Sequence, residues 1–149
     1  MKLEWVLKKF DELTPTELYA IMQLRNEVFV VEQNCVYQDA DNKDKKSYHF
    51  MGWNEEVLVA YTRILPPGVA FKEASIGRVV NSPKYRRTGT GRQLMVLSIS
   101  NTFSLFSCTE IKIGAQLYLK QFYVLLGFVQ CSEMYLEDNI PHIEMLLAK

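Results

Sequence analysis

Cysteine is scarce in this chain of 149 residues, and the three that occur, Cys35, Cys108 and Cys131, lie far apart with no CxxC pair. An odd number of widely spaced cysteines argues against both a disulfide framework and a structural zinc site. Histidine is scarcer still, since only His49 and His142 are present and neither has a second ligand at metal-binding spacing. We therefore expect a reducing, cytoplasmic setting and no bound metal.

The sequence also lacks a long apolar run and an excess of charge of either sign. No segment is long and apolar enough to span a bilayer, and residues 1–10 resemble neither a secretory signal nor a membrane anchor. The 17 basic residues balance 17 acidic residues, which favours neither nucleic acid nor an anionic membrane as a partner. Any recognition of phosphate must then be local. The length suits a single domain, residues 1–149.

Apolar periodicity predicts a mixed α/β fold. We expect helices at residues 15–28, 89–106 and 118–126, and strands at residues 4–10, 48–53, 57–65, 75–81, 110–115, 128–136 and 142–147. The second and third strands should form an antiparallel hairpin. The fourth and fifth strands flank the second helix and should form a βαβ unit with it.

Three local signals refine this prediction. Thr14 and Glu17 have the spacing of a capping box, which predicts where the first helix begins. The β-branched run at 28–31 fits either a strand or a buried helix end, and periodicity does not choose between them. The charge-rich stretch at 39–47 is expected to be a solvated loop at the entrance to a binding site, with its acids neutralised by its three lysines.

Six residues between a predicted strand and a predicted helix carry the clearest chemical signal: Arg86, Arg87, Thr88, Gly89, Thr90 and Gly91. A helix N-terminus offers unpaired backbone N–H groups and a partial positive charge, and both attract phosphate. The glycines let a phosphate approach the backbone, and Arg86, Arg87 and Arg92 can add charge-assisted hydrogen bonds. The spacing is neither that of a P-loop nor that of GxGxxG, and an ordinary basic loop at a helix start fits it about as well.

This segment resembles the acetyl-CoA signature of the Gcn5-related N-acetyltransferase (GNAT) family, which has the pattern R/Q-x-x-G-x-G/A between a strand and a helix. A second element of that family, a tyrosine followed four residues later by Gly-Phe, is matched by Tyr123 with Gly127 and Phe128. Within the signature, Arg87 replaces the commoner Gly, and Thr90 replaces the usual Ile or Leu. Two elements in the right order are far more specific than one.

Further segments, at 28–33, 76–79 and 141–145, narrow the resemblance to the ElaA-like group and extend it over almost the whole chain. The resemblance implies a GNAT fold. Its central sheet should be twisted and mostly antiparallel, with six to seven strands that splay apart at the cofactor site. About four helices should flank it.

The resemblance also implies acetyl-CoA as the acyl donor. The pantetheine arm should pair with the backbone of Val79, Val80 and Asn81, as an added strand would. The pyrophosphate should lie on the amides of residues 87–92. Gln116 occupies the place where many relatives bind the cofactor with an Asn, and capping the end of its strand is an equally good role for it.

Tyr123 lies at the family position of the general acid that protonates the departing CoA thiolate. A phenol pKa of about 10 exceeds that of a typical thiol, so a neutral tyrosine can donate its proton. The residue types alone indicate only a buried core tyrosine. An amine acceptor must also lose a proton before it attacks, and the candidate bases are Glu73, Glu32 and His49. Each fits a solvated carboxylate or a strand histidine as well, and a water chain is equally compatible.

Two functions are compatible with these observations. The first is an acetyl-CoA-dependent N-acetyltransferase that acts directly on a primary amine. The second is a non-catalytic acyl-CoA-binding or protein-interaction module on the same fold. No residue identifies the acceptor, because small amines, peptide N-termini and lysine side chains all fit. Exposed parts of the apolar helix face around Phe103 and Phe106 could support a homodimer.

Overall fold

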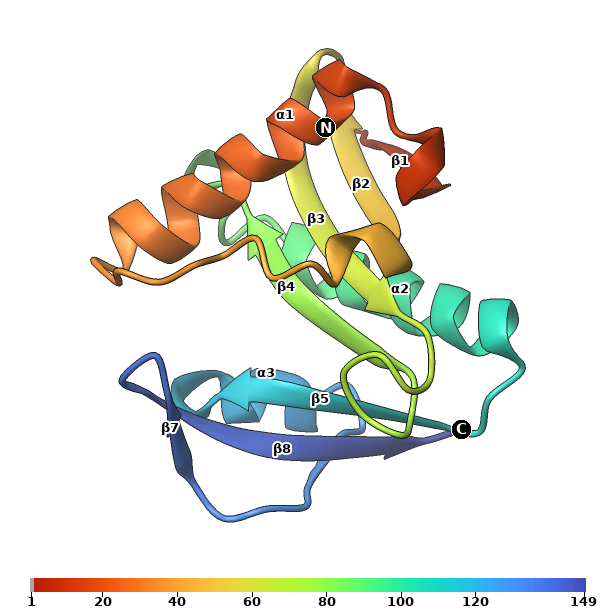
Figure 1. Ribbon diagram of the computed structural model, residues 1–149, viewed down its shortest axis with the longest axis vertical. Coiled ribbons are helices and arrows are strands. Elements are labelled where there is room, and N and C mark those ends of the chain that lie inside the picture. The colour runs from red at the N-terminus through yellow and green to blue at the C-terminus, as the bar shows by residue number, and fades with distance from the viewer. Residues whose placement is uncertain (1) are drawn as a thin grey trace.

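Two antiparallel sheets of four strands each form the frame of the molecule (Figure 1). The computed structural model describes residues 2–149, and Met1 lies outside the described part. The first sheet has the order β1-β2-β3-β4, with β1 at Glu4–Lys9, β2 at Tyr48–Asn54, β3 at Val57–Leu65 and β4 at Ser75–Asn81. In the second sheet, β8 (Ile140–Ala148) pairs with β5 (Glu110–Gln116), β6 (Val129–Gln130) and β7 (Tyr135–Glu137).

The first helix begins at the capping box that the sequence predicted. The Thr14 hydroxyl oxygen accepts a hydrogen bond from the Glu17 N–H, and the Glu17 carboxylate accepts one from the Thr14 N–H. Helix α1 spans Pro15–Arg25 and continues as a π-helix over Asn26–Glu32. The run at 28–31, for which strand and helix were both open, is therefore helical.

Two helices cover opposite faces of the first sheet (Figure 1). Ile21 of α1 packs in one buried cluster with Met51, whereas Leu94 of α2 (Thr90–Phe106) packs in another with Phe50. Successive residues of a strand point to opposite faces, so the neighbours at positions 50 and 51 reach different helices. Among residues 2–149, no helix is both long and apolar enough to cross a bilayer.

The two sheets meet at one end only. Strands β4 and β5 run parallel and flank α2, as the predicted βαβ unit requires, but their one bridge joins Ala74 to Ile111. There the Lys112 N–H donates to the Ala74 carbonyl at 3.0 Å. Beyond this bridge the described strands separate, and β4 keeps a free edge toward β5.

The predicted mixed α/β architecture, with a splayed and mostly antiparallel sheet, is confirmed. The described residues hold eight strands rather than six or seven. They hold three α-helices, the first of which continues as the π-helix, where about four helices were expected. The additional strand arises near the C-terminus, where the strand predicted at 128–136 is two short strands, β6 and β7. Between these two strands, the Ser132 hydroxyl oxygen accepts a hydrogen bond from the Glu144 N–H at 2.8 Å. This side-chain hydrogen bond takes the place of a backbone hydrogen bond between neighbouring strands.

The third helix is shorter than the sequence predicted. In place of a helix at 118–126, a 3₁₀ turn at Leu117–Leu119 leads into α3 at Lys120–Val124. Gly127 has φ +103°, which confirms the left-handed cap expected at that position. The turn directs the chain into the second sheet, where Phe128 is buried.

The charge-rich stretch at 39–47 was wrongly predicted to be a solvated loop. Asp39 and Asp44 are 7% and 5% exposed. Arg25 of α1 is fully buried and donates to both carboxylates, at 2.8 Å to Asp39 and 2.7 Å to Asp44. A buried carboxylate is tolerated only when a cation or several donors compensate it, and here that cation comes from another element.

Two further arginines complete this buried ionic cluster. Arg63 of β3 binds Asp41 at 2.7 Å, and Arg78 of β4 binds Asp39 at 2.7 Å. Burial disfavours the charged form of Asp41, but the hydrogen bonds and charge of Arg63 outweigh it and lower the pKa of Asp41 to about 2. The loop lysines contribute little, since Lys43 approaches Asp41 only to 3.9 Å.

Candidate active site

A cleft of about 1220 Å³ lies where β4 and β5 separate. Its walls come from the end of β4, the end of β5, the π-helix, the loop that follows the π-helix, α3, and the β7–β8 turn. Among the sequence-predicted site residues, those that line the cleft are Glu32, Val79, Val80, Asn81, Arg86, Arg87, Gln116 and Tyr123. Glu73 and residues 88–92 are outside this lining.

A β-bulge shapes the β4 wall of the cleft. Tyr61 pairs with Val80 and Arg63 pairs with Gly77, so two residues of β4 face a single residue of β3 between these pairs. Arg78, one of the two, has φ +50°. A bulge turns the strand locally, and β4 has no hydrogen-bonded neighbour on the β5 side beyond Ala74 in the described residues. The backbone N–H and C=O groups on that edge are therefore free to pair with an extended ligand.

The N-terminus of α2 adjoins the cleft through Arg86 and Arg87. Gly89 is its N-cap residue, with φ +82°, and no side chain caps the helix. The nearby hydroxyls bond each other instead, since those of Thr88 and Thr90 are 2.7 Å apart. The first backbone N–H groups of α2 thus keep their capacity to bind an anion. A Cβ placed on Gly91 would meet nothing closer than Asn81 Nδ2, at 3.8 Å, so this approach is open.

An exposed ion pair crosses the cleft between the π-helix and the loop before α2. The two guanidinium nitrogens of Arg86 donate to the two carboxylate oxygens of Glu32 at 2.8 and 2.6 Å. Hydrogen bonding and charge from Arg86 lower the pKa of Glu32. Glu32 is thus a weaker base than an ordinary glutamate, and Arg86 is engaged by protein rather than free for phosphate.

The family resemblance implies acetyl-CoA in this cleft, and the pairing then predicts that Glu32 competes with the phosphates of acetyl-CoA for Arg86. Replacing Glu32 by Gln should tighten acetyl-CoA binding by about threefold to tenfold at low salt, because Arg86 no longer leaves an ion pair to bind phosphate. Isothermal titration calorimetry at two salt concentrations measures this. Glu56→Gln, at the exposed β2–β3 turn, is the matched control and should leave the dissociation constant unchanged. Weaker binding by Glu32→Gln would show that Glu32 supports the site.

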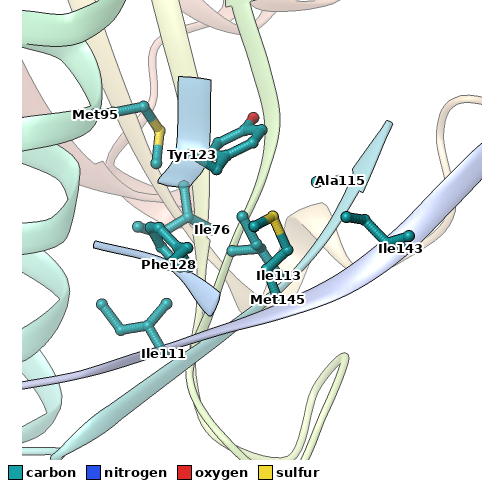
Figure 2. Close-up of a cluster of buried hydrophobic side chains, with 9 residues drawn as sticks. All are labelled: Ile76, Met95, Ile111, Ile113, Ala115, Tyr123, Phe128, Ile143 and Met145. Atoms are coloured by element: carbon teal, nitrogen blue, oxygen red, sulfur yellow. The ribbon is translucent and has the colours of Figure 1, made fainter. Parts of the chain in front are cut away.

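Tyr123 lies at the base of the cleft, where α3 packs on the second sheet. Its side chain is 5% exposed, and its ring makes edge contacts with Phe122 and Phe128 at centroid distances of 5.1 and 5.9 Å. Tyr123 belongs to a buried cluster that includes Ile76, Ile113 and Met145. Figure 2 shows the tyrosine ring above these aliphatic side chains, with its hydroxyl directed away from them. The hydroxyl forms no hydrogen bond with another described residue. Burial raises the pKa of Tyr123, so the phenol stays protonated well above neutral pH.

Two contacts join the residues just after the π-helix to other walls of the cleft. The side-chain amides of Gln33 and Gln116 exchange hydrogen bonds at 3.3 and 3.4 Å. The Cys35 thiol donates to the Asp138 carbonyl at 3.5 Å, which connects the loop after the π-helix to the β7–β8 turn. Gln116 therefore lies in the cleft, but its amide is engaged by Gln33.

Two of the candidate bases lie outside the cleft lining. Glu73 immediately precedes Ala74, at the end where the sheets are joined. His49 is fully buried, with Nδ1 2.7 Å from the Tyr61 hydroxyl and Nε2 2.9 Å from the Asp44 carbonyl. Burial lowers the pKa of His49, and both ring nitrogens are occupied. The geometry of His49 is that of a structural histidine. Within residues 2–149, no three potential ligands cluster as a metal site would require.

The polar residues in the cleft that were not singled out as site residues from the sequence include Tyr37, Asp41, Arg78 and His142. Arg78 and His142 belong to segments that carried the resemblance to the ElaA-like group, which is the signal that could have identified them. Asp41 lies in the stretch at 39–47 that was expected to be solvated, and Tyr37 lies two residues before that stretch. Nothing in the sequence around Tyr37 indicates that it faces a cleft.

Comparison with known proteins gives consistent matches over this whole architecture. Residues 12–149 match the acetyltransferase (GNAT) domain family. ElaA of Escherichia coli is 41% identical over 145 residues, which are 96% of this chain and 95% of that protein, and its crystal structure superposes with a TM-score of 0.91. The crystal structure of an acyl-CoA N-acyltransferase from Pseudomonas aeruginosa has 44% identity and a TM-score of 0.92, and the match covers 98% of this chain and 100% of that one. A UPF0039 protein of Schizosaccharomyces pombe is 43% identical over 147 residues, which are 97% of each chain.

Proposed function

This chain belongs to the GNAT acetyltransferase family, as the resemblance to the ElaA-like group predicted, and we propose that it transfers an acetyl group from acetyl-CoA directly to a primary amine. The observation that carries the proposal is one cleft that combines three features. The free edge of β4 and the unpaired hydroxyl of Tyr123 line this cleft, and the uncapped start of α2 adjoins it through Arg86 and Arg87. We also propose that residues 1–149 act as a single acyltransferase domain.

The donor is proposed to bind along β4 and α2. The two amides of the pantetheine arm pair with the backbone of Val79, Val80 and Asn81, and the pyrophosphate lies on the amides of residues 87–92. Asn81 supports this assignment, because its side-chain oxygen is buried with no hydrogen-bond partner among the described residues. An amide N–H of the donor would satisfy that oxygen, whose isolation otherwise costs about 1–3 kcal/mol.

The reaction needs a proton for the leaving group. As the amine nitrogen attacks the thioester carbonyl carbon, the C–N bond forms, the C–S bond breaks and sulfur leaves as a thiolate. Tyr123 is proposed to give its phenolic proton to that sulfur, since burial keeps the phenol neutral and leaves its hydroxyl unpaired in the cleft. A backbone N–H on the free edge of β4 can polarise the thioester carbonyl.

The proposal is tested by following thiol release from acetyl-CoA in the presence of a panel of primary amines, with mass spectrometry of the acetylated product. We expect amine-dependent release of CoA with at least one member of the panel. Stabilisation of the protein by CoA without turnover on any amine would favour the alternative, a non-catalytic acyl-CoA-binding module. Absence of both stabilisation and turnover would contradict acyl-CoA binding altogether.

A further inference from the structure

His142 is a buried histidine whose two ring nitrogens have different surroundings. It lies on β8, lines the cleft and is 7% exposed. Its Nδ1 is 2.7 Å from the Ile140 carbonyl oxygen. A carbonyl oxygen can only accept, so Nδ1 carries the proton of the neutral ring, and Nε2 keeps a lone pair.

The Nε2 atom faces an acidic side chain. The Glu137 carboxylate oxygen lies 3.5 Å from it, and Glu137 makes no ion pair with any other described residue. A carboxylate at this distance stabilises the imidazolium that forms when Nε2 takes up a proton. The ring of Tyr135 stacks on the imidazole at a centroid distance of 5.9 Å and fixes its plane. The ring is therefore held in an orientation that suits proton transfer at Nε2.

The register of the second sheet relates His142 to the other cleft residues. His142 pairs with Gln116 at the end of β5, where both residues line the cleft. The next residue, Ile143, packs in the buried cluster that contains Tyr123. Since successive strand residues point to opposite faces, His142 lies on the face of the sheet away from α3. The histidine and Tyr123 thus approach the cleft from opposite faces, as a base for the nucleophile and an acid for the leaving group would.

We propose that His142 is the general base that deprotonates the acceptor amine, and that Glu137 is a positioning residue that stabilises its protonated form. This inference rests on the proposed acyl transfer. Nε2 takes one proton from the ammonium group, and the neutral amine attacks the thioester carbonyl. The second proton lost by nitrogen restores the phenol of Tyr123 through solvent, and His142 releases its proton to bulk water. The products are the amide, the CoA thiol and one proton.

Few other titratable groups face this imidazole. Tyr135 and Glu137 come from β7, and the β5 residue opposite, Gln116, is uncharged. Glu144, which lies two residues after His142 on β8, forms an ion pair with Lys112 at 3.1 Å. The β7–β8 turn holds Asp138, whose carbonyl accepts from the Cys35 thiol. Glu137 is therefore the charge with a direct contact to His142.

The test compares two amines of nearly the same shape, ethylamine and 2,2,2-trifluoroethylamine. At neutral pH ethylamine is a cation that must lose a proton, whereas the fluorinated amine is already neutral. His142→Gln should lower kcat/KM by about 100-fold or more with ethylamine but by less than about threefold with trifluoroethylamine. It should also remove the acidic limb of the pH profile. Glu137→Gln should lower kcat/KM with ethylamine more than with trifluoroethylamine, and the exposed Glu133→Gln should change neither.

Each outcome decides between the alternatives. Equal losses with both amines, or an acidic limb that persists in His142→Gln, would overturn the role of His142. If the wild-type protein turns over neither amine nor any member of the wider panel, the proposed acyl transfer fails instead. In that case a nitrogen-15 NMR titration of the imidazole decides the inference independently. A neutral ring protonated at Nδ1 supports His142 as a proton acceptor, and a ring protonated at Nε2 overturns it.

Discussion

Replacing Tyr123 by Phe is expected to lower kcat by about 10²–10³-fold while the dissociation constant for acetyl-CoA changes by less than about twofold. The substitution removes one hydroxyl and leaves the ring, whose edge contacts with Phe122 and Phe128 hold α3 on the sheet. The loss is catalytic because the CoA thiolate then departs without a proton donor. Steady-state kinetics together with calorimetric titration of acetyl-CoA separates the two effects.

Tyr118 provides the matched control for this substitution. It also lines the cleft but is 74% exposed, and Tyr118→Phe should leave kcat within about twofold of the wild type. Because burial raises the pKa of Tyr123, the wild-type kcat should show no loss from phenol ionisation at mildly alkaline pH. Unchanged turnover in Tyr123→Phe would remove the acid role and leave Tyr123 as a packing residue.

Replacing Arg25 by Met is expected to destabilise the protein by about 3–5 kcal/mol, because Asp39 and Asp44 stay buried after losing their shared cation. Met retains much of the volume of the arginine side chain, so the main loss is charge compensation rather than packing. Urea unfolding, monitored by circular dichroism, measures the free energy of unfolding. The loop that carries these acids also carries Tyr37 and Asp41 into the cleft, so activity should fall as well.

Lys8→Met is the control for the loss of an ion pair in a more exposed setting. The Lys8 ammonium is 3.0 Å from the Glu17 carboxylate, and its side chain is 30% exposed. Such a pair contributes at most about 1 kcal/mol, so the free energy of unfolding should change little. Equal small effects of the two substitutions would mean that solvent or the remaining arginines compensate Asp39 and Asp44 fully.

Elements with strong local signals could be predicted from the sequence. The β2–β3 hairpin, the start of α1 at Thr14 and the left-handed Gly127 are each determined by neighbouring residues, and the structure has them as expected. The π-helix at Asn26–Glu32 could not be predicted, because its β-branched run fits strand and helix equally. The break between β6 and β7 occurs where the Glu144 N–H donates to the Ser132 hydroxyl instead of to a backbone carbonyl. The apolar periodicity of the sequence contains no signal for such a contact.

The backbone segments that form the candidate site could be predicted from the sequence. The loop before α2 and the end of β4 lie where the family resemblance implied, at the splay of the two sheets. The side-chain partners could not be predicted, because they connect residues far apart in sequence. Glu32 and Arg86 are separated by 54 positions, and Arg25 reaches acids 14 and 19 positions away. His142 was overlooked for the same reason, since its orientation depends on the β7–β8 turn.

The central claim is that acetyl-CoA binds in the cleft between β4 and β5. Amide hydrogen exchange with and without saturating acetyl-CoA tests this most directly, because the proposed contacts are mainly to backbone N–H groups. We expect slower exchange at residues 79–81 and 87–92. Unchanged exchange there would contradict the account, as would protection confined to the separate groove on α1 and the π-helix that includes Tyr19 and Glu27.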